Sequence, residues 1–327
     1  MTTHDPLDAV TGAFSYTGAS ITDALIERGR RVRTLTGHPD RAFSSGAPVE
    51  VRPLDFTDGA QLRQSLGGVD TLYNTYWVRF PHASTTFETA IDNSRRLFTA
   101  AADAGVRRIV HVSITHPDTG SPYPYFRGKA AVEDHLNATG ISHAIARPAF
   151  LFGRDGVLIN NVAWMLRHLP VVAVGDGGGY WVRGIHVDDL ATLCADLGEQ
   201  DRDVTMDAVG PERMTFRTLM GHVRDAVAPK TPIVSVPGWA LPPLTTAIGV
   251  LLRDRLLTSD EYDAMADGLA DSQAPTNGQT RFTDWLTANA QSLGRHYIND
   301  TRRPFRPAAP GAPSRQTNPP PPRELTP

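Results

Sequence analysis

Short apolar segments alternate with amphipathic ones over roughly the first 150 residues of the chain. Six segments have the apolar content of strands: 8–11, 31–36, 49–52, 69–73, 108–113 and 141–147. Four intervening segments place apolar residues at helical spacing: 19–28, 61–66, 87–104 and 129–139. This alternation predicts right-handed crossovers and a parallel sheet with both faces covered. The expected fold class is therefore a doubly wound α/β fold, which binds ligands at the carboxyl ends of its strands.

The pattern loosens after residue 153. The elements expected there are helices at 157–168 and 188–196 and strands at 171–174, 181–187 and 204–209. From residue 215 onward the sequence is helical and irregular. We therefore expect a smaller, mainly helical C-terminal lobe that shapes a substrate pocket.

These patterns also predict the domain organisation. A dinucleotide-binding domain is expected in residues 1–153, with strand and helix contributions from about 181–210. The substrate lobe takes residues 154–180 and 211–302. The proline-rich stretch 303–327 has almost no apolar periodicity and is expected to be a disordered tail.

Composition narrows the function classes. The 327 residues include 32 Lys and Arg against 35 Asp and Glu, a formal net charge of -3 that argues against binding nucleic acid. One cysteine, Cys194, excludes a disulfide framework, and the eleven histidines show no metal-ligand spacing. The longest apolar run, 240–252, is shorter than the roughly 18–20 residues that span a bilayer. No signal peptide is apparent, so we expect a cytoplasmic protein with a small-molecule substrate, and a homo-oligomer is compatible with the sequence.

A glycine-rich turn joins the first strand to the first helix. It contains Gly12, Phe14, Ser15, Tyr16 and Gly18. The first glycine permits a tight turn, the last lets helix and strand pack closely, and amide groups at the helix start can hold a pyrophosphate. Serine stands at position 15, where a third glycine is usual. The alternative is an ordinary strand-to-helix loop.

This turn resembles the Thr-Gly-x-x-Gly-x-x-Gly fingerprint of the short-chain dehydrogenase/reductase superfamily, with Ser15 as the departure. The likeness extends over about residues 7–210 and indicates the extended, NmrA-like branch, with a Rossmann fold and a nicotinamide cofactor. Within it, Asp55 and Phe56 match the pair that contacts the adenine ring, although Asp55 also suits a turn. Asn93 matches an asparagine of extended members, and we assign it a structural role.

The end of the second predicted strand bears on the choice of cofactor. An acid there would favour NAD, but this sequence has none. His38 and Arg41 could instead meet a 2′-phosphate, which favours NADP over NAD; the alternative is that both are solvated. NmrA-like relatives often carry an arginine where Gly37 stands here. Thr36 and Thr75, at the ends of the second and fourth strands, complete the candidates for cofactor binding.

Tyr125 and Lys129 form a Tyr-x-x-x-Lys pattern after the fifth strand. Residues four apart share one helix face, so both side chains are expected to point into one pocket. The lysine charge would lower the phenol pKa and suit Tyr125 to proton transfer, while Lys129 could also hold the cofactor ribose. Ser113, our first choice, or Thr115 would polarise the substrate oxygen. Only two lysines occur in this arginine-rich chain. The alternative is a surface lysine beside a half-buried tyrosine.

This segment resembles the Ser/Thr–Tyr–Lys active site of short-chain dehydrogenases. The Pro-Tyr-Pro sequence at 122–124 could displace the tyrosine, and NmrA-like proteins often lose its role. The resemblance also implies that Arg147 and Pro148 position the nicotinamide. Asp188 and Asp189 match a Val-Asp-Asp segment of extended members, and we expect them to cap the next helix.

Two functions follow. The first is an NAD(P)-dependent oxidoreductase that transfers hydride at a carbonyl or alcohol carbon, alone or within an epimerase or dehydratase reaction. The second is a non-catalytic NAD(P)-binding sensor or accessory protein of NmrA-like type.

Overall fold

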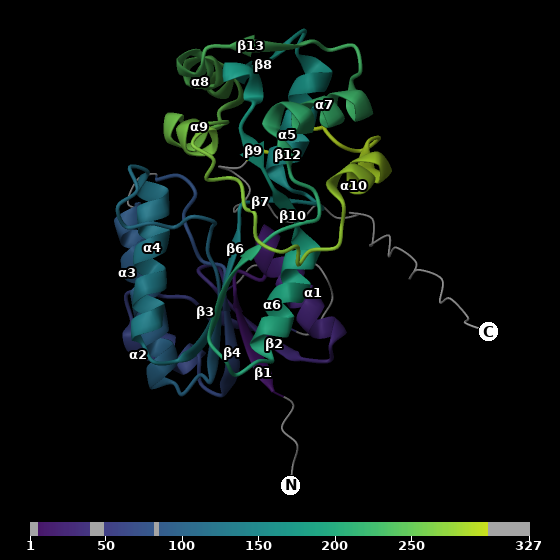
Figure 1. Ribbon diagram of the computed structural model, residues 1–327. Helices are drawn as coiled ribbons and strands as arrows, with labels where there is room; N and C mark the ends of the chain where they lie inside the picture. The colour runs from purple at the N-terminus through teal and green to yellow at the C-terminus, as the bar shows by residue number, and fades with distance from the viewer. Residues whose placement is uncertain (1–5, 40–48, 82–84, 300–327) are drawn as a thin grey trace, which may run out of the picture.

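Seven strands form the central sheet of the structure, a computed structural model that describes residues 6–39, 49–81 and 85–299 (Figure 1). They are β1 (Leu7–Thr11), β2 (Arg31–Thr36), β3 (Val49–Pro53), β4 (Val69–Asn74), β5 (Arg108–Val112), β6 (Ser142–Pro148) and β11 (Val204–Ala208). All pairs are parallel, in the order β11-β6-β5-β4-β1-β2-β3. The order reverses between β1 and β4, which is where a doubly wound sheet binds its ligand. The predicted fold class is confirmed.

Helices cover both faces of this sheet (Figure 1). On one face lie α2 (Gly59–Ser65), α3 (Phe87–Asp103) and α4 (Pro124–Ala138), and on the other lie α1 (Tyr16–Glu27) and α6 (Val187–Gly198). Each layer has its own buried hydrophobic cluster, one around Leu97 and Phe98 of α3 and one around Ile21 of α1 and Leu190 of α6. Burial on both faces is the reason that β1 is buried along its whole length and that even polar residues of β2 and β5, such as Thr34 and His111, are buried.

The lobe lies beyond the carboxyl ends of the strands (Figure 1). Its helices are α5 (Val157–His168), α7 (Phe216–Val227), α8 (Leu241–Leu252), α9 (Ser259–Ala266) and α10 (Phe282–Asn289). Its strand pairs are β7 (Phe150–Phe152) with β10 (Gly184–His186), β8 (Val172–Gly175) with β13 (Ile233–Val236), and β9 (Trp181–Val182) with β12 (Met214–Thr215). These three pairs are short, and the lobe is mainly helical, as predicted. Residues 181–182, expected to contribute to the first domain, pair within the lobe.

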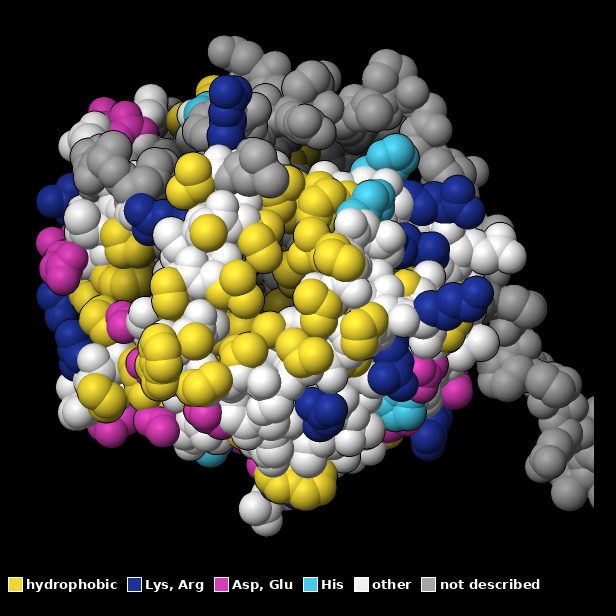
Figure 2. Space-filling view, turned by 90° about the horizontal axis from the view of Figure 1, so that it is seen from above, with side chains coloured by type: hydrophobic (Ala, Val, Ile, Leu, Met, Phe, Trp, Pro, Cys, Tyr) yellow, Lys and Arg dark blue, Asp and Glu magenta, His cyan; other side chains and the backbone are white. Residues whose placement is uncertain are grey.

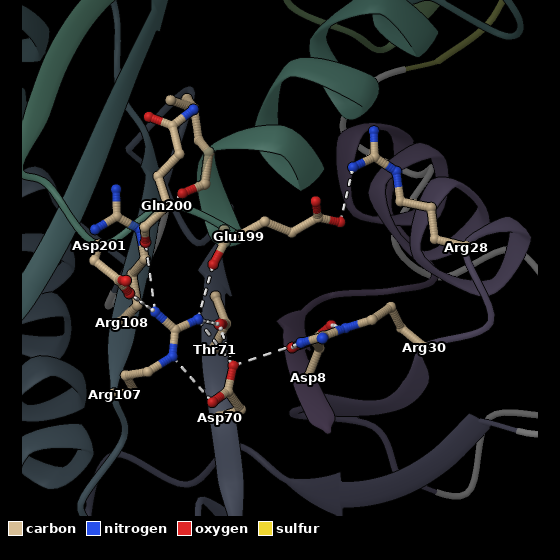
Figure 3. A network of polar contacts seen from close by, with 12 residues as sticks. Asp8, Arg28, Arg30, Asp70, Thr71, Arg107, Arg108, Glu199, Gln200 and Asp201 are labelled. Atoms are coloured by element: carbon tan, nitrogen blue, oxygen red, sulfur yellow. Dashed lines mark hydrogen bonds and ion pairs between the residues drawn. The ribbon is translucent and has the colours of Figure 1, made fainter. Parts of the chain in front are cut away.

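Arginines and aspartates close the opposite, amino-terminal edge of the sheet (Figure 3). Arg30 Nη2 lies 2.6 Å from the fully buried carboxylate of Asp8, and Arg107 Nη2 lies 3.0 Å from Asp70. Arg108, also buried, donates from Nε to the carbonyl of Leu197 at 2.7 Å. Burial raises the pKa of Asp8, and Arg30 opposes that shift. Structural ion pairs therefore occupy the amino-terminal edge of the sheet. The carboxyl edge is the one available to a ligand.

Candidate active site and cofactor site

The turn after β1 has the geometry that close approach of a helix requires. Gly12 has a φ of 67°, in the left-handed region, and its amide donates to the carbonyl of Leu35 at 3.0 Å. A Cβ atom added at Gly18 would lie 2.1 Å from the Gly12 carbonyl oxygen, so only glycine fits there. This contact holds the start of α1 directly over the end of β1.

Ser15 is the N-cap of α1. Its hydroxyl accepts a hydrogen bond from the Gly18 amide at 3.2 Å, which explains why serine is suitable at the position where the fingerprint has a glycine. Tyr16 begins the helix, and its hydroxyl donates to the carbonyl of Gly153 at 2.9 Å. Phe14 is half-buried in the same turn. Through this hydrogen bond, the turn also contacts the segment at Gly153 that leads into the lobe.

Polar residues at the ends of β2 and β4 lie beside this turn. Thr75 donates from its hydroxyl to the Thr11 carbonyl at 2.7 Å, and Thr36 accepts from the His38 amide at 3.1 Å. His38 itself is exposed. Arg41, its proposed partner for a 2′-phosphate, lies outside the described residues.

The residues predicted to meet the adenine are partly used by the fold. Asp55 forms a turn in which Oδ1 accepts from the Thr57 amide at 2.8 Å and hydroxyl at 2.7 Å, and these bonds lower the pKa of Asp55. The ring of Phe56 lies 4.8 Å from that of Tyr76. The Tyr76 hydroxyl in turn accepts from Asn93 Nδ2 at 2.9 Å, in line with the structural role expected of Asn93. Contact with adenine stays a prediction.

Tyr125 and Lys129 both lie on α4, because that helix begins at Pro124 rather than at residue 129 as expected. The Lys129 ammonium donates to the carbonyl of Val112 at 3.0 Å and lies 4.8 Å from the Trp77 ring centroid. The Tyr125 ring meets the Trp77 ring edge-on at 5.8 Å. Trp77 therefore contacts both members of the motif, a relationship that the sequence pattern did not predict.

The electrostatics of the pair differ from expectation. Burial raises the pKa of Tyr125 to about 12, with the charge of Arg79 lowering it and that of Glu261 raising it. Burial lowers the pKa of Lys129 to about 7, and Glu133 opposes that shift. The prediction that Lys129 lowers the phenol pKa is therefore wrong for this structure. Tyr125 is instead a phenol that stays protonated at neutral pH.

The two hydroxyl candidates after β5 differ in their partners. Thr115 donates from Oγ1 to the carbonyl of Leu269 at 2.8 Å and so links the sheet to the lobe. Ser113 is buried, and its Oγ has no hydrogen-bond partner among the described residues. Because a buried hydroxyl without a partner is costly, Ser113 is the better candidate to meet a ligand oxygen.

Arg147 and Pro148 end β6. Arg147 Nε donates to Oε1 of Glu133 at 3.0 Å, and the Glu133 carboxylate is buried. Glu133 was not among the predicted site residues, and its spacing of four residues from Lys129 on α4 is the one sequence signal for it. Pro148 is buried and accepts at its carbonyl from the Thr115 amide at 3.2 Å. Both residues hold the site together, and a contact with nicotinamide stays a prediction.

The acids at the start of α6 are also structural, but neither is its N-cap. His186 caps the helix by accepting from the Asp188 amide at 3.2 Å. Asp188 forms an ion pair with Arg154 at 2.7 Å. Asp189 accepts from the amide of Thr280 at 2.7 Å and so holds a returning segment of the lobe.

Beside Tyr125 lies a cavity of about 1040 Å³ between the carboxyl edge of the sheet and the lobe. Ile114, after β5, and Tyr125 line it on the side of the sheet, and α5, α7, α8 and α9 line it on the side of the lobe. In the part of the chain that the structure describes, no cluster of three or more His, Cys, Asp or Glu could hold a metal ion.

Residues 12–163 match a family model described as NAD(P)H-binding. This segment is an NAD(P)H-binding domain. The match includes the glycine-rich turn, Ser113, Tyr125 and Lys129, and it confirms the resemblance inferred from the motifs. The structure fits such a cofactor, because Gly12 and Gly18 bring the start of α1 close to the strand end, and the buried Ser113 hydroxyl has no partner within the described part of the chain.

Two curated relatives show how far sequence similarity reaches. Sterol demethylase protein B of Methylococcus capsulatus is 36% identical over 108 residues, which are 32% of this chain and 33% of that protein. The 40 kDa subunit of NADH-ubiquinone oxidoreductase of Neurospora crassa is 24% identical over 227 residues, 68% of this chain and 60% of the relative. The chain thus spans about a third of the length of the first and three fifths of the second.

Solved structures share the fold over most of the chain. Triphenylmethane reductase of Citrobacter sp., in complex with NADP(H), superposes with a TM-score of 0.70 at 20% identity, covering 86% of this chain and 99% of that one. The NADPH-dependent quinone oxidoreductase of Escherichia coli gives 0.70 at 20% identity, covering 87% and 98%. None of the helices within the described residues is both long and apolar enough to cross a membrane.

Proposed function

We propose that the protein is an NADP-preferring oxidoreductase that reduces a carbonyl group, with Tyr125 as the proton donor. The observation that carries this proposal is the position of Tyr125 on the wall of the large cavity, at the carboxyl end of the sheet. The Lys129 bond to the Val112 carbonyl ties α4 to the end of β5, where Ser113 directly follows. The predicted hydroxyl, phenol and amine thus belong to two adjacent elements.

The chemistry of these residues favours reduction over oxidation. A phenol with a pKa of about 12 carries its proton at neutral pH and can give it to a carbonyl oxygen that becomes an alcohol. Ser113 Oγ, which has no hydrogen-bond partner among the described residues, is the proposed second donor to this oxygen. Lys129 uses one of its N–H groups on Val112, which leaves others for a ribose hydroxyl. When bound, the nicotinamide would supply the hydride.

Three features support the preference for NADP. No acid stands at the end of β2, His38 beyond it is exposed, and the Escherichia coli and Citrobacter neighbours bear NADP(H) according to their descriptions. A 2′-phosphate there would meet no carboxylate on the described part of that strand end. NAD is the alternative cofactor.

Substitution of Tyr125 tests the proposal. With a panel of ketones and quinones and NADPH as reductant, Tyr125→Phe should lower kcat by about 10²-fold or more and leave the Kd of NADPH unchanged. Tyr297→Phe is the matched control, because the Tyr297 hydroxyl contacts Asp254 in the lobe and does not line the cavity. Unchanged turnover in Tyr125→Phe would exclude this residue as the donor.

A non-catalytic NAD(P)-binding role is the second candidate. The observation in its favour is that Lys129 contacts Val112 and Trp77 and does not tune the pKa of Tyr125. Tight binding of NADPH without turnover of any member of the panel would support this role. An epimerase or dehydratase reaction would use the same residues and would appear as isomerised or dehydrated product without net consumption of NADPH.

A further inference from the structure

The cavity beside Tyr125 is large for a small polar substrate. Its volume of about 1040 Å³ stands at the upper end of the roughly 300–1,000 Å³ typical of ligand pockets. The lobe supplies most of its wall from α5, α7, α8, α9, β8 and β13, while Tyr125 stands on the side of the sheet. A ligand with its reacting group at Tyr125 therefore has most of its bulk in the lobe.

The wall of this cavity is apolar. Typical lining residues from the lobe are Val162, Met165, Phe216, Met220, Val236 and Ile248. Binding against such a wall is favoured by about 25 cal/mol for each Å² of apolar ligand surface removed from water. A hydroxyl-rich ligand gains little there, because its polar groups would lose their hydrogen bonds to water.

Few charged side chains line the cavity, and the cations among them have protein partners. Among the described lining residues they are Arg79, Glu88, Arg255, Asp260 and Glu261. Arg79 pairs with Glu261 at 3.1 Å, and Arg255 donates from Nη1 to the carbonyl of Pro81 at 3.3 Å. The other two are exposed carboxylates. The lining therefore offers no cluster of cations, within the described residues, for the phosphates of a nucleotide sugar.

The rim of the cavity is apolar as well. Seven large hydrophobic side chains of the described residues are exposed, and four of them line this cavity: Leu158, Val171, Val234 and Leu244, each 40–44% exposed. Figure 2, which looks onto the lobe, shows hydrophobic side chains gathered around a hollow. An apolar rim continuous with an apolar interior is the entrance expected for a lipophilic molecule.

We propose that this cavity binds a large, uncharged, lipophilic carbonyl compound, a polycyclic or isoprenoid ketone or quinone, with its oxygen toward Tyr125 and its hydrocarbon bulk in the lobe. This assignment rests on the proposed function for the reacting end of the substrate, and on the cavity alone for the rest. The apolar wall, together with the lack of a cation cluster among the described lining residues, argues against a sugar nucleotide as the preferred ligand.

Direct binding tests the assignment without any turnover. The full chain, saturated with NADP⁺, is titrated by calorimetry with progesterone, with decylubiquinone and with UDP-glucose. We expect micromolar binding of at least one of the two lipophiles and none of UDP-glucose. Binding of neither lipophile, or preferential binding of UDP-glucose, overturns the proposal.

Two substitutions on α8 locate the binding site. Leu244 lines the cavity, whereas Val250 is 74% exposed and does not. Leu244→Glu should weaken binding of the lipophile by about tenfold or more, because a carboxylate at the apolar rim must lose water when the ligand binds. Val250→Glu adds the same charge to the same helix and should leave the Kd within about twofold of the unmodified protein. Equal effects of both substitutions, or no effect of Leu244→Glu, overturn the assignment.

These results are separable from those for the proposed chemistry. NADPH binding and circular dichroism verify that both variants are folded. If lipophiles bind at the cavity but Tyr125→Phe leaves their reduction unchanged, the cavity assignment holds and the proposed proton donor fails. If small water-soluble aldehydes are reduced in a Tyr125-dependent way while lipophiles do not bind, the reverse holds.

Discussion

The ammonium group of Lys129 lies over the indole of Trp77, 4.8 Å from the ring centroid. The same indole meets the ring of Tyr125 at 84°. Gly128 makes this arrangement possible, because a Cβ atom there would come within 2.9 Å of the indole. The cation is buried, so its partners are the ring face, the Val112 carbonyl and the more distant charge of Glu133.

Burial of Lys129 predicts a pH-dependent stability. The folded-state pKa of about 7 lies below the unfolded value of 10.5, so between these values the unfolded chain binds the extra proton. The free energy of unfolding should therefore rise from about pH 7 to pH 10, with a slope of at most about 1.4 kcal/mol per pH unit from this group. Urea unfolding of the unmodified protein and of Lys129→Met measures it.

The difference between the two proteins isolates Lys129 from other groups that titrate in this range. Lys129→Met also removes the hydrogen bond to Val112. Loss of that bond lowers the free energy of unfolding by the same amount at every pH, so it does not contribute to the difference in slope. Parallel pH profiles for the two proteins would show that Lys129 keeps an ordinary pKa in the folded state.

The cap formed by Ser15 predicts a specific order of stabilities. Ser15→Ala removes the acceptor for the Gly18 amide and should lower the free energy of unfolding by about 1 kcal/mol. Ser15→Gly restores the fingerprint glycine and should cost only a few tenths of a kcal/mol. Thermal unfolding of both variants gives the order, and NADPH titration should show that both still bind the cofactor. Equal losses of stability would mean that the hydroxyl is not the cap in solution.

The parts of the fold that follow from local sequence were predictable. The glycine-rich turn, the six strands before residue 153 and the helix at 157–168 each have a periodicity or a turn signal of their own. The start of α4 was misplaced: the helix was expected from residue 129, but it begins at Pro124, and proline is favoured in the first turn of a helix. This error concerned the helix that carries Tyr125.

The rest of the site depends on contacts between distant segments. β8 pairs with β13 across some sixty residues, and Thr115 bonds to Leu269, which is 154 residues away in the sequence. Nothing in the local sequence indicates that Trp77 contacts both Tyr125 and Lys129. Periodicity identifies which residues are apolar, whereas the cavity arises from how the lobe packs over the sheet.

The end of β2 predicts how cofactor preference can be changed. A Cβ atom at Gly37 meets no described atom within 4 Å, and the φ of Gly37 is not in the left-handed region, so the site accepts a side chain. Gly37→Asp would place a carboxylate that repels a 2′-phosphate and can accept from a ribose hydroxyl. The ratio of affinities for NADPH over NADH should fall by about tenfold, or about 1.4 kcal/mol, in calorimetric titrations. Gly37→Asn is the uncharged control, and an equal change in both variants would contradict a role for the charge.

The ion pair of Arg147 and Glu133 predicts an asymmetry. The Glu133 side chain is 4% exposed and that of Arg147 is 29% exposed. Arg147→Met leaves a buried carboxylate without its partner and should lower the free energy of unfolding by about 3 kcal/mol or more. Glu133→Gln should lower it less, because the arginine left without its partner can still reach water. The double variant should recover part of the loss of Arg147→Met, because no charge is then left buried. Denaturant unfolding of the three variants tests this order. If Glu133→Gln lowers the free energy of unfolding more than Arg147→Met does, the prediction is wrong. The arginine, and not the carboxylate, would then be the group that needs its ion-pair partner between α4 and β6.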